Sequence, residues 1–283
     1  MTPTFKPWEE LTISDNYMFQ LVMREPKLCK YLLEKLLQIE IQKIKFLDNE
    51  KTLDAGLDHK SIRLDVYVKD EAGRTYDIEM QCANQGRRNL VKRAFIYQSM
   101  IAVDQLKKGI RYEKLNPQYV IFICTFDVFG KGLPIYWIES SVRQNRDIIV
   151  EDEAHRIFLN SKAADYEKDD EMADFLRYVN GQEAVGKFTQ EIDRAVRMIK
   201  TEEGRRMQYM LFTQEIQWMK EDSFAEGEAK GMAKGMEKGK AEGKAEEKLE
   251  AAQKLLQLGV PVETIAAGTG LPLEEVQKMA KKK

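Results

Sequence analysis

The chain has 283 residues and a mass of 32.9 kDa, which suggests one large domain or a domain with an appendage. Hydrophobic residues make up 43% and charged residues 33%, so the chain can build a core and a wholly disordered protein is excluded. No apolar run reaches the roughly 18–20 residues of a membrane-spanning helix, so an integral membrane protein is excluded as well. The net charge of −2 gives no general support for nucleic-acid binding, and any such surface must be local.

The ends and the cysteines of the sequence bear on where the protein works. The N-terminal residues show no basic stretch followed by an apolar one, so no secretory signal is expected. Cys29, Cys82 and Cys124 stand far apart and are odd in number, which fits neither a disulfide framework nor a CxxC zinc site. A reducing cytoplasm is therefore the expected location.

The first elements predicted are a divided helix and a strand. Apolar side chains recur at helical spacing over residues 15–37, and Ser14 or Asp15 is expected to cap the start of this helix. Pro26 is expected to separate it into two pieces. Residues 41–49 then alternate apolar and polar side chains, which predicts a strand.

A β-hairpin is predicted next. Residues 61–69 and 75–81 both alternate apolar and polar side chains around a turn that contains Gly73. With a three-residue loop, Gly73 takes the left-handed position and Asp65 lies opposite Glu79. A loop of two or four residues would put these carboxylates on opposite faces, because a one-residue slip inverts the face of every side chain.

Further elements follow the hairpin. The pattern predicts, in chain order, a helix over 89–108, strands over 118–126, 135–138 and 147–150, and helices over 168–220. Gly109 is well placed to end the first of these helices. The run over 118–126 is almost wholly apolar, as expected for a strand that is buried on both faces.

The last sixty or so residues differ in composition from the rest. Glycine recurs every fourth residue among Lys, Glu, Ala and Met, at Gly227, Gly231, Gly235, Gly239 and Gly243. A helix with a stripe of small residues fits this pattern, and so does a flexible charged linker, because each Gly costs nearly 1 kcal/mol relative to Ala. Three short helices are expected over 251–258, 261–267 and 272–280. The last two form either a helix-turn-helix or part of a docking or oligomerisation module.

The hairpin carries the candidate chemistry. Asp65, Glu79 and Gln81 are expected on one face, where opposed carboxylates repel each other. A divalent cation removes that cost, and Mg²⁺ or Mn²⁺ prefers oxygen ligands, lowers the pKa of bound water and stabilises a phosphoryl transition state. The amide of Gln81 can orient that water or contact a phosphate. The alternative is an ordinary solvated hairpin face, with Asp77 and Arg63 as further surface charges.

Four segments together resemble the Rpn family of recombination-promoting nucleases and transposase-like proteins, which lies within the PD-(D/E)XK nuclease superfamily. The segments are 15–20 (DNYMFQ), 64–81 (LDVYVKDEAGRTYDIEMQ), 93–100 (RAFIYQSM) and 109–123 (GIRYEKLNPQYVIFI). The resemblance covers about residues 8–220. Asp65 and the run from Glu79 to Gln81 look like the superfamily motif Asp…(Asp/Glu)-x-Lys.

The resemblance implies an α/β fold. Its core is of the PD-(D/E)XK restriction-endonuclease-like type, with a mixed central sheet flanked by helices in the order α-β-β-β-α-β, and a helical C-terminal extension follows. The expected domains are a nuclease-like core (1–165), a helical extension (166–222), a Gly/Lys/Glu repeat that is a helix or a linker (223–250), and a three-helix or helix-turn-helix module (251–283).

The resemblance also implies roles for residues. Asp65 and Glu79 become the ligands of Mg²⁺ (or Mn²⁺), and Gln81 becomes a catalytic residue where the superfamily usually has Lys. Gln occurs at this position in the family, so activity is not excluded. Lys60 is a candidate for a supporting charge. Asp15 adds a metal contact through water, or it only caps its helix.

The helix after the hairpin supplies the candidate contacts to nucleic acid. Arg93 and Tyr97 are one turn apart and share a face. In the functional interpretation Arg93 contacts phosphate and Tyr97 forms a hydrogen bond near the metal; in the other, Arg93 is a surface charge and Tyr97 belongs to the core. A cluster of basic residues follows the predicted strand that carries Glu79: Arg87, Arg88, Lys92 and Arg93. These side chains would attract a phosphate backbone. In the alternative interpretation they are ordinary solvated side chains of a helix.

The expected function is therefore that of a Mg²⁺-dependent DNA endonuclease that hydrolyses backbone phosphodiesters. The alternative is a catalytically inactive protein that binds nucleic acid or associates with itself on a nuclease scaffold, and nothing separates hydrolysis from strand transfer. DNA is the expected partner, and the C-terminal helical region favours a homo-oligomer. The sequence has no P-loop and no GxSxG motif, and His59 and His155 belong to no HExxH motif, although His59 stays a weak candidate.

Overall fold

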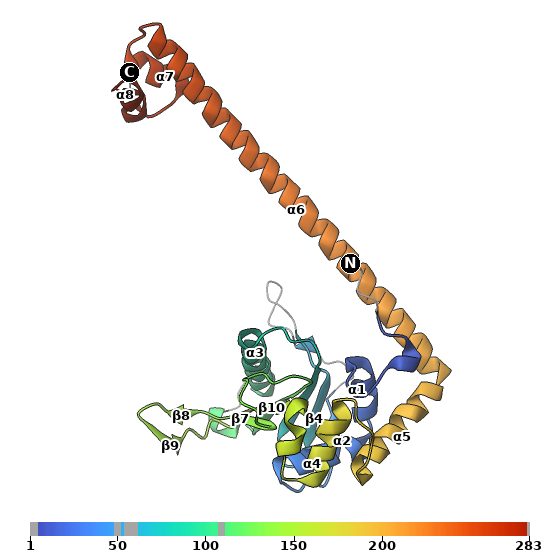
Figure 1. The fold of residues 1–283 in the computed structure, drawn as a ribbon. Coiled ribbons are helices and arrows are strands. Elements are labelled where there is room, and N and C mark those ends of the chain that lie inside the picture. The colour runs from blue at the N-terminus through green and yellow to red at the C-terminus, as the bar shows by residue number, and fades with distance from the viewer. Residues whose placement is uncertain (1–4, 48–51, 54–61, 107–110, 282–283) are drawn as a thin grey trace. The chain divides into compact units, whose positions relative to one another are not determined.

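The computed structural model describes residues 5–47, 52–53, 62–106 and 111–281 of the chain (Figure 1). Two units, Met1–Met210 and Leu211–Lys283, are each compact. The finer division into residues 1–165, 166–222, 223–250 and 251–283 stays a prediction.

The first unit is built on a six-stranded mixed sheet in the order β1-β4-β5-β6-β10-β7. Its strands are β1 (Ile44–Phe46), β4 (Val66–Asp70), β5 (Thr75–Gln81), β6 (Gln118–Cys124), β7 (Ile135–Ile138) and β10 (Ala154–Asn160). β5, β6 and β10 run parallel, and the other neighbours pair antiparallel. Two short sheets stand apart from it: β2 (Thr52–Leu53) with β3 (Ile62–Arg63), and β8 (Ser141–Val142) with β9 (Asn145–Ile149).

The register of the hairpin β4–β5 is the predicted one. Tyr67 pairs with Asp77 and Lys69 pairs with Thr75, and Gly73 in the loop has a φ of 89°. This φ lies in the left-handed region, where glycine carries no steric penalty. The two strands therefore align Asp65 with Glu79, as a three-residue loop requires.

The predicted strand over 61–69 is interrupted, which strict alternation did not indicate. β3 ends at Arg63 and β4 begins at Val66. Leu64 packs in the same core cluster as Tyr67, although residues three apart on a regular strand face opposite ways. The break at Leu64 and Asp65 takes the backbone of Asp65 out of the regular ladder. His59 and Lys60 lie outside the described residues.

Helices flank the sheet (Figure 1). They are α1 (Asn16–Met23), α2 (Pro26–Leu37), α3 (Arg87–Gln105), α4 (Asp170–Val179) and α5 (Lys187–Thr201), with short 3₁₀ turns η1 (Trp8–Glu10), η2 (Tyr112–Lys114) and η3 (Ser161–Tyr166). Pro26 starts α2, so the predicted division of the first helix is confirmed. α3 packs on β6 and β10, while α1 packs on β5 and on α5.

The sequence missed one strand of the main sheet. β10 carries only three consecutive fully buried apolar residues, Ile157, Phe158 and Leu159, flanked by polar side chains that hide a strand signal. The strand predicted over 147–150 corresponds to β9, which pairs with β8 and is exposed along its whole length. β10 instead pairs in parallel with β6 and lies between β6 and β7 in the main sheet.

The second unit consists of helix. α6 (Glu203–Gln257) begins in the first unit and continues through the glycine repeat, and α7 (Val262–Thr269) and α8 (Leu273–Lys281) follow. Residues 251–257 therefore belong to α6 and are not a separate short helix, because the first backbone turn comes at Gly259, where φ is 77°. Ala252, Ile265 and Val276 form a small core at this end. None of the helices in the described residues is long and apolar enough to cross a membrane.

Candidate active site

Strand β5 buries a row of polar side chains. Asp77, Glu79 and Gln81 are 0%, 1% and 5% exposed, and they share the face that pairs with Val120, Phe122 and Cys124 of β6. The core cluster on this face includes Leu90, Ala94 and Ile101 of α3, which covers it. The hairpin face is therefore not an ordinary solvated one, and Asp77 is not the surface charge of the alternative interpretation.

The structure brings Asp65 and Glu79 together across the hairpin. The backbone N–H of Asp65 donates to Oε1 of Glu79 at 2.9 Å. The carboxylate of Asp65 accepts from the backbone N–H of Met80 at 3.3 Å through Oδ2, and from Nε2 of Gln20 at 2.8 Å through Oδ1. The first of these bonds forms at the break between β3 and β4, where Asp65 belongs to neither strand.

Arg93 of α3 points into the same site. Its Nη2 donates to Oε2 of Glu79 at 2.7 Å, and its Nη1 donates to Oε1 of Gln81 at 2.9 Å. Its Cζ lies 4.9 Å from the ring centroid of Phe122 and 5.3 Å from that of Tyr97, so the guanidinium also makes cation–π contacts. Arg93 is thus anchored in the site and is not a free surface charge.

The charges of this site do not balance. Asp65, Asp77 and Glu79 stand against one guanidinium, that of Arg93. Burial, together with the charge of Glu79, raises the pKa of Asp65 and of Asp77 well above the usual range. Burial also raises the pKa of Glu79, although Arg93 opposes the shift. As charged groups, three carboxylates and one cation leave an excess of negative charge in a region of low dielectric.

Asp77 is the least satisfied of these groups. Among the residues that the structure describes, no donor reaches either of its carboxylate oxygens. The hydrogen bond open to it is the one with Glu79, and two carboxyls form such a bond only by sharing a proton. The carboxyl group of Asp77 is therefore either negatively charged or protonated, and it lies two residues before Glu79 on the same face of β5.

A comparison with protein families decides which group of proteins this is. A family model described as PD-(D/E)XK nuclease family transposase matches residues 17–223, more than half of the chain. The chain belongs to this family. Neither a curated protein nor a solved structure matches at a significant level. The mixed sheet with flanking helices agrees with this membership, so the predicted α/β PD-(D/E)XK nuclease-like fold is confirmed.

PD-(D/E)XK nucleases typically use divalent metals, so the fit of the site to such an ion matters. No group of three or more His, Cys, Asp and Glu side chains within the described ranges is arranged to hold a metal. Mg²⁺ often binds through only one or two carboxylates and keeps several waters. The carboxyl oxygens of Asp65 and Glu79 suit such an ion, whose charge would favour their ionised forms, so the donor set fits.

The remaining predicted residues lie in different settings. Asp15 is the residue before α1, but its carboxylate accepts from the backbone N–H of Thr12 at 2.7 Å and pairs with Lys6 at 2.9 Å, with no side-chain cap bond to the helix. Tyr97 packs against the core cluster on the α3 face. The basic residues Arg87, Arg88 and Lys92 are exposed at the start of α3.

Sequence reasoning missed Gln20 and the burial of Asp77. Gln20 stands 45 residues before its partner Asp65, and no short-range spacing marks it. Asp77 did carry a signal, because it continues the polar row of Glu79 and Gln81 at alternate positions of one strand. Three acidic or amide side chains on one strand face indicate a site when another element covers that face.

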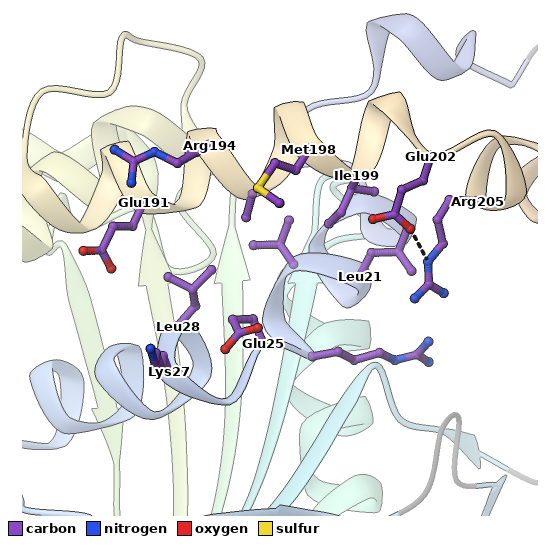
Figure 2. A pocket seen from close by; sticks show the side chains of 13 residues that line it. Leu21, Glu25, Lys27, Leu28, Glu191, Arg194, Met198, Ile199, Glu202 and Arg205 are labelled. Atoms are coloured by element: carbon purple, nitrogen blue, oxygen red, sulfur yellow. Dashed lines mark ion pairs between the residues drawn. The ribbon is translucent and has the colours of Figure 1, made fainter.

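The first unit also has a pocket that is lined by none of the residues of this polar cluster. It measures about 690 Å³ and lies between α1–α2 and the α5–α6 junction (Figure 2). Leu21, Met198 and Ile199 form an apolar part of its lining, with acidic and basic side chains around them. Because both signs of charge line it, the hollow shows no preference for a phosphate backbone, and none of the predicted site residues lies in it.

Proposed function

We propose that the chain is a Mg²⁺-dependent DNA endonuclease of the Rpn type, which hydrolyses backbone phosphodiesters. The observation that carries this proposal is the contact between Asp65 and Glu79 across the hairpin, within a family of nuclease-like proteins. Two carboxyl side chains on residues that touch across the hairpin offer the oxygen ligands that a hard cation prefers.

Each residue of the site has a role in this proposal. Asp65 and Glu79 hold Mg²⁺ or Mn²⁺, which when bound lowers the pKa of a water and stabilises the charge of the phosphoryl transition state. Gln20 orients the carboxylate of Asp65 through its 2.8 Å hydrogen bond. Arg93 supplies the positive charge that Gln81 lacks, and Gln81 holds Arg93 in place.

DNA is the proposed partner. Arg87, Arg88 and Lys92 are exposed on the first turns of α3, the helix that carries Arg93 into the site. No ion pair in the described part of the chain engages these three side chains. They are therefore free to contact phosphates on either side of the bond to be cut.

An inactive nucleic-acid-binding protein on the same scaffold is the second candidate. Two observations favour it: Gln81 replaces the usual Lys, and the described residues contain no cluster of three metal-ligating side chains. Retention of DNA that ignores divalent cations, without cleavage, would be its signature.

The first prediction concerns the metal. Supercoiled plasmid is expected to be nicked or linearised in Mg²⁺ or Mn²⁺ and to stay intact in EDTA, because the attacking water needs the cation. Asp65→Ala is expected to be inactive in all conditions. Agarose-gel assays of both proteins, with Ca²⁺ as a further condition, measure this. Cleavage that persists in EDTA, or in Asp65→Ala, contradicts the proposed mechanism.

A second prediction concerns self-association through the C-terminal helical region. α6 exposes Trp218, Phe224, Met232 and Met236 and contains the glycine repeat, which makes an unpartnered helix costly by nearly 1 kcal/mol per Gly. Packing against a second copy would offset that cost, so sedimentation equilibrium of the full chain is expected to give at least a dimer. A monomer at micromolar concentration contradicts this part of the proposal.

A further inference from the structure

Two lysines face each other on neighbouring strands of the main sheet. Lys45 of β1 is the direct partner of Lys69 of β4 in the antiparallel register. Side chains directly opposite each other have Cβ atoms about 5 Å apart, and like charges in such pairs are destabilising. The chain thus accepts a local cost, which an anion between the two ammonium groups would remove.

This pair lies on the same sheet face as the acidic residues of the site. Lys69 follows Tyr67 by two residues, and Tyr67 pairs with Asp77, so all three share a face. Asp77 precedes Glu79 by two residues on the same strand. Lys69 pairs with Thr75, and because a strand rises about 3.3 Å per residue, Thr75 stands about 13 Å along β5 from Glu79.

The described acids near these lysines do not form ion pairs with them. Lys43, Lys45 and Lys69 form no ion pair with any residue that the structure describes. The nearest acids are engaged elsewhere. Asp70 bonds Arg74 through Nε at 2.5 Å and the hydroxyl of Tyr76 at 2.7 Å.

Glu71 is engaged as well. Its carboxylate accepts the backbone N–H groups of Gln42 at 3.0 Å and of Lys43 at 3.1 Å. A hollow of about 240 Å³ lies at this edge of the sheet, between β1 and the end of β4, and the three lysines line it together with Ile44, Asp70 and Glu71. The space beside the lysines is therefore open.

Protection of the sheet edge explains only part of this arrangement. β1 is an edge strand, and lysines on edge strands prevent pairing with other chains. Lys43 and Lys45 fit that explanation. Lys69 does not, because β4 is paired on both sides, with β1 and β5.

We propose that Lys45 and Lys69, with Lys43 beside them, bind the phosphate backbone of the nucleic acid whose phosphodiester lies at Asp65 and Glu79. The inference rests on the proposed function and extends it to a second contact surface, away from the start of α3. DNA bound there crosses the β4–β1 edge of the sheet and reaches the site from that side. The ligand chemistry is a phosphodiester backbone, read without regard to base sequence.

The test is a double variant, Lys45→Gln/Lys69→Gln, in the full chain. Binding of a fluorescent duplex is measured by anisotropy in EDTA, so that no cleavage occurs, over a series of salt concentrations. Each phosphate contact contributes about −0.9 to the slope of log affinity against log salt. The double variant is expected to bind about 10-fold more weakly and to show a slope less negative by about 2. Its Tm is expected to be unchanged or higher, because a like-charge pair is gone.

The matched control is Lys27→Gln/Lys131→Gln, which removes the same charge at two exposed positions elsewhere. It is expected to keep the salt slope of the wild type. A wild-type slope in Lys45→Gln/Lys69→Gln overturns the inference and leaves the nuclease proposal standing if plasmid cleavage is intact. A wild-type chain that neither binds nor cuts DNA overturns both.

Discussion

Glu79→Gln is expected to lower metal-dependent DNA cleavage by about 1,000-fold while the chain stays folded. Glu79 accepts from the Asp65 backbone through Oε1 at 2.9 Å and from Arg93 through Oε2 at 2.7 Å. The single amide oxygen of Gln keeps one of these two bonds in a side chain of nearly the same shape. What is lost is the charge that holds the cation, and about 4 kcal/mol of transition-state stabilisation corresponds to a factor of about 1,000 in rate. Initial rates of plasmid nicking in Mg²⁺ measure the loss, and thermal melts check the fold.

Two further variants separate chemistry from folding in this experiment. Glu183→Gln removes a carboxylate that is exposed outside the site and is expected to cleave at the wild-type rate. Glu79→Ala also removes the acceptor of Arg93, so it is expected to be inactive and less stable. If Glu79→Gln retains more than about a tenth of the wild-type rate, a margin well inside the expected effect of a lost metal ligand, Glu79 is not a ligand of the catalytic metal.

The register of the hairpin was predictable because its determinants are local. The alternation of the two strands and the single glycine of the loop lie within about twenty residues, and together they allow one pairing in which both apolar faces coincide. The same holds for the division of the first helix at Pro26, since proline lacks the N–H that a helix interior needs. Local rules of this kind also located β5, β6 and β7 to within two residues.

The burial of the site was not predictable in the same way. Alternation shows that Asp77 and Glu79 share a face, but it does not show what covers that face. α3 covers it, and it also brings Arg93 onto Glu79, which stands 14 residues earlier in the chain. The bond from Gln20 to Asp65 depends on how α1 packs against the sheet. Contacts set by packing between elements leave no periodic signal in the sequence.

The break at Leu64 and Asp65 shows where a pattern misleads. Residues 61–69 alternate without a fault, yet β3 ends at Arg63 and β4 begins at Val66. A strand that stops alternating is a common feature next to active sites, where it redirects a side chain or a backbone group. Here the Asp65 N–H donates to the side-chain carboxylate of Glu79 on β5 and not to a backbone carbonyl.

Arg93→Ala is expected to lower the free energy of unfolding by about 3 kcal/mol, because removing one partner of a buried ion pair leaves the other uncompensated. Glu79 is 1% exposed and accepts hydrogen bonds from the Asp65 N–H and from Arg93. Without Arg93, only the bond from the Asp65 N–H remains. Arg93→Lys is expected to lose less stability, since Lys keeps the charge. It is still expected to lose some, because Lys has no planar fork that bonds Glu79 and Gln81 at once and contacts the rings of Tyr97 and Phe122. Urea unfolding at pH 7 in EDTA measures both.

Restoring the charge balance by other means should recover that stability. Asp77→Asn removes one carboxyl and lets its amide donate to Glu79, so Arg93→Ala/Asp77→Asn is expected to be more stable than Arg93→Ala alone. Mg²⁺ is expected to raise the Tm of Arg93→Ala by more than that of the wild type, because an ion held by Asp65 and Glu79 stabilises only the folded state. If neither change restores stability, the loss in Arg93→Ala comes from the packing of its side chain against Phe122 and Tyr97, and the excess negative charge of the site does not govern its stability.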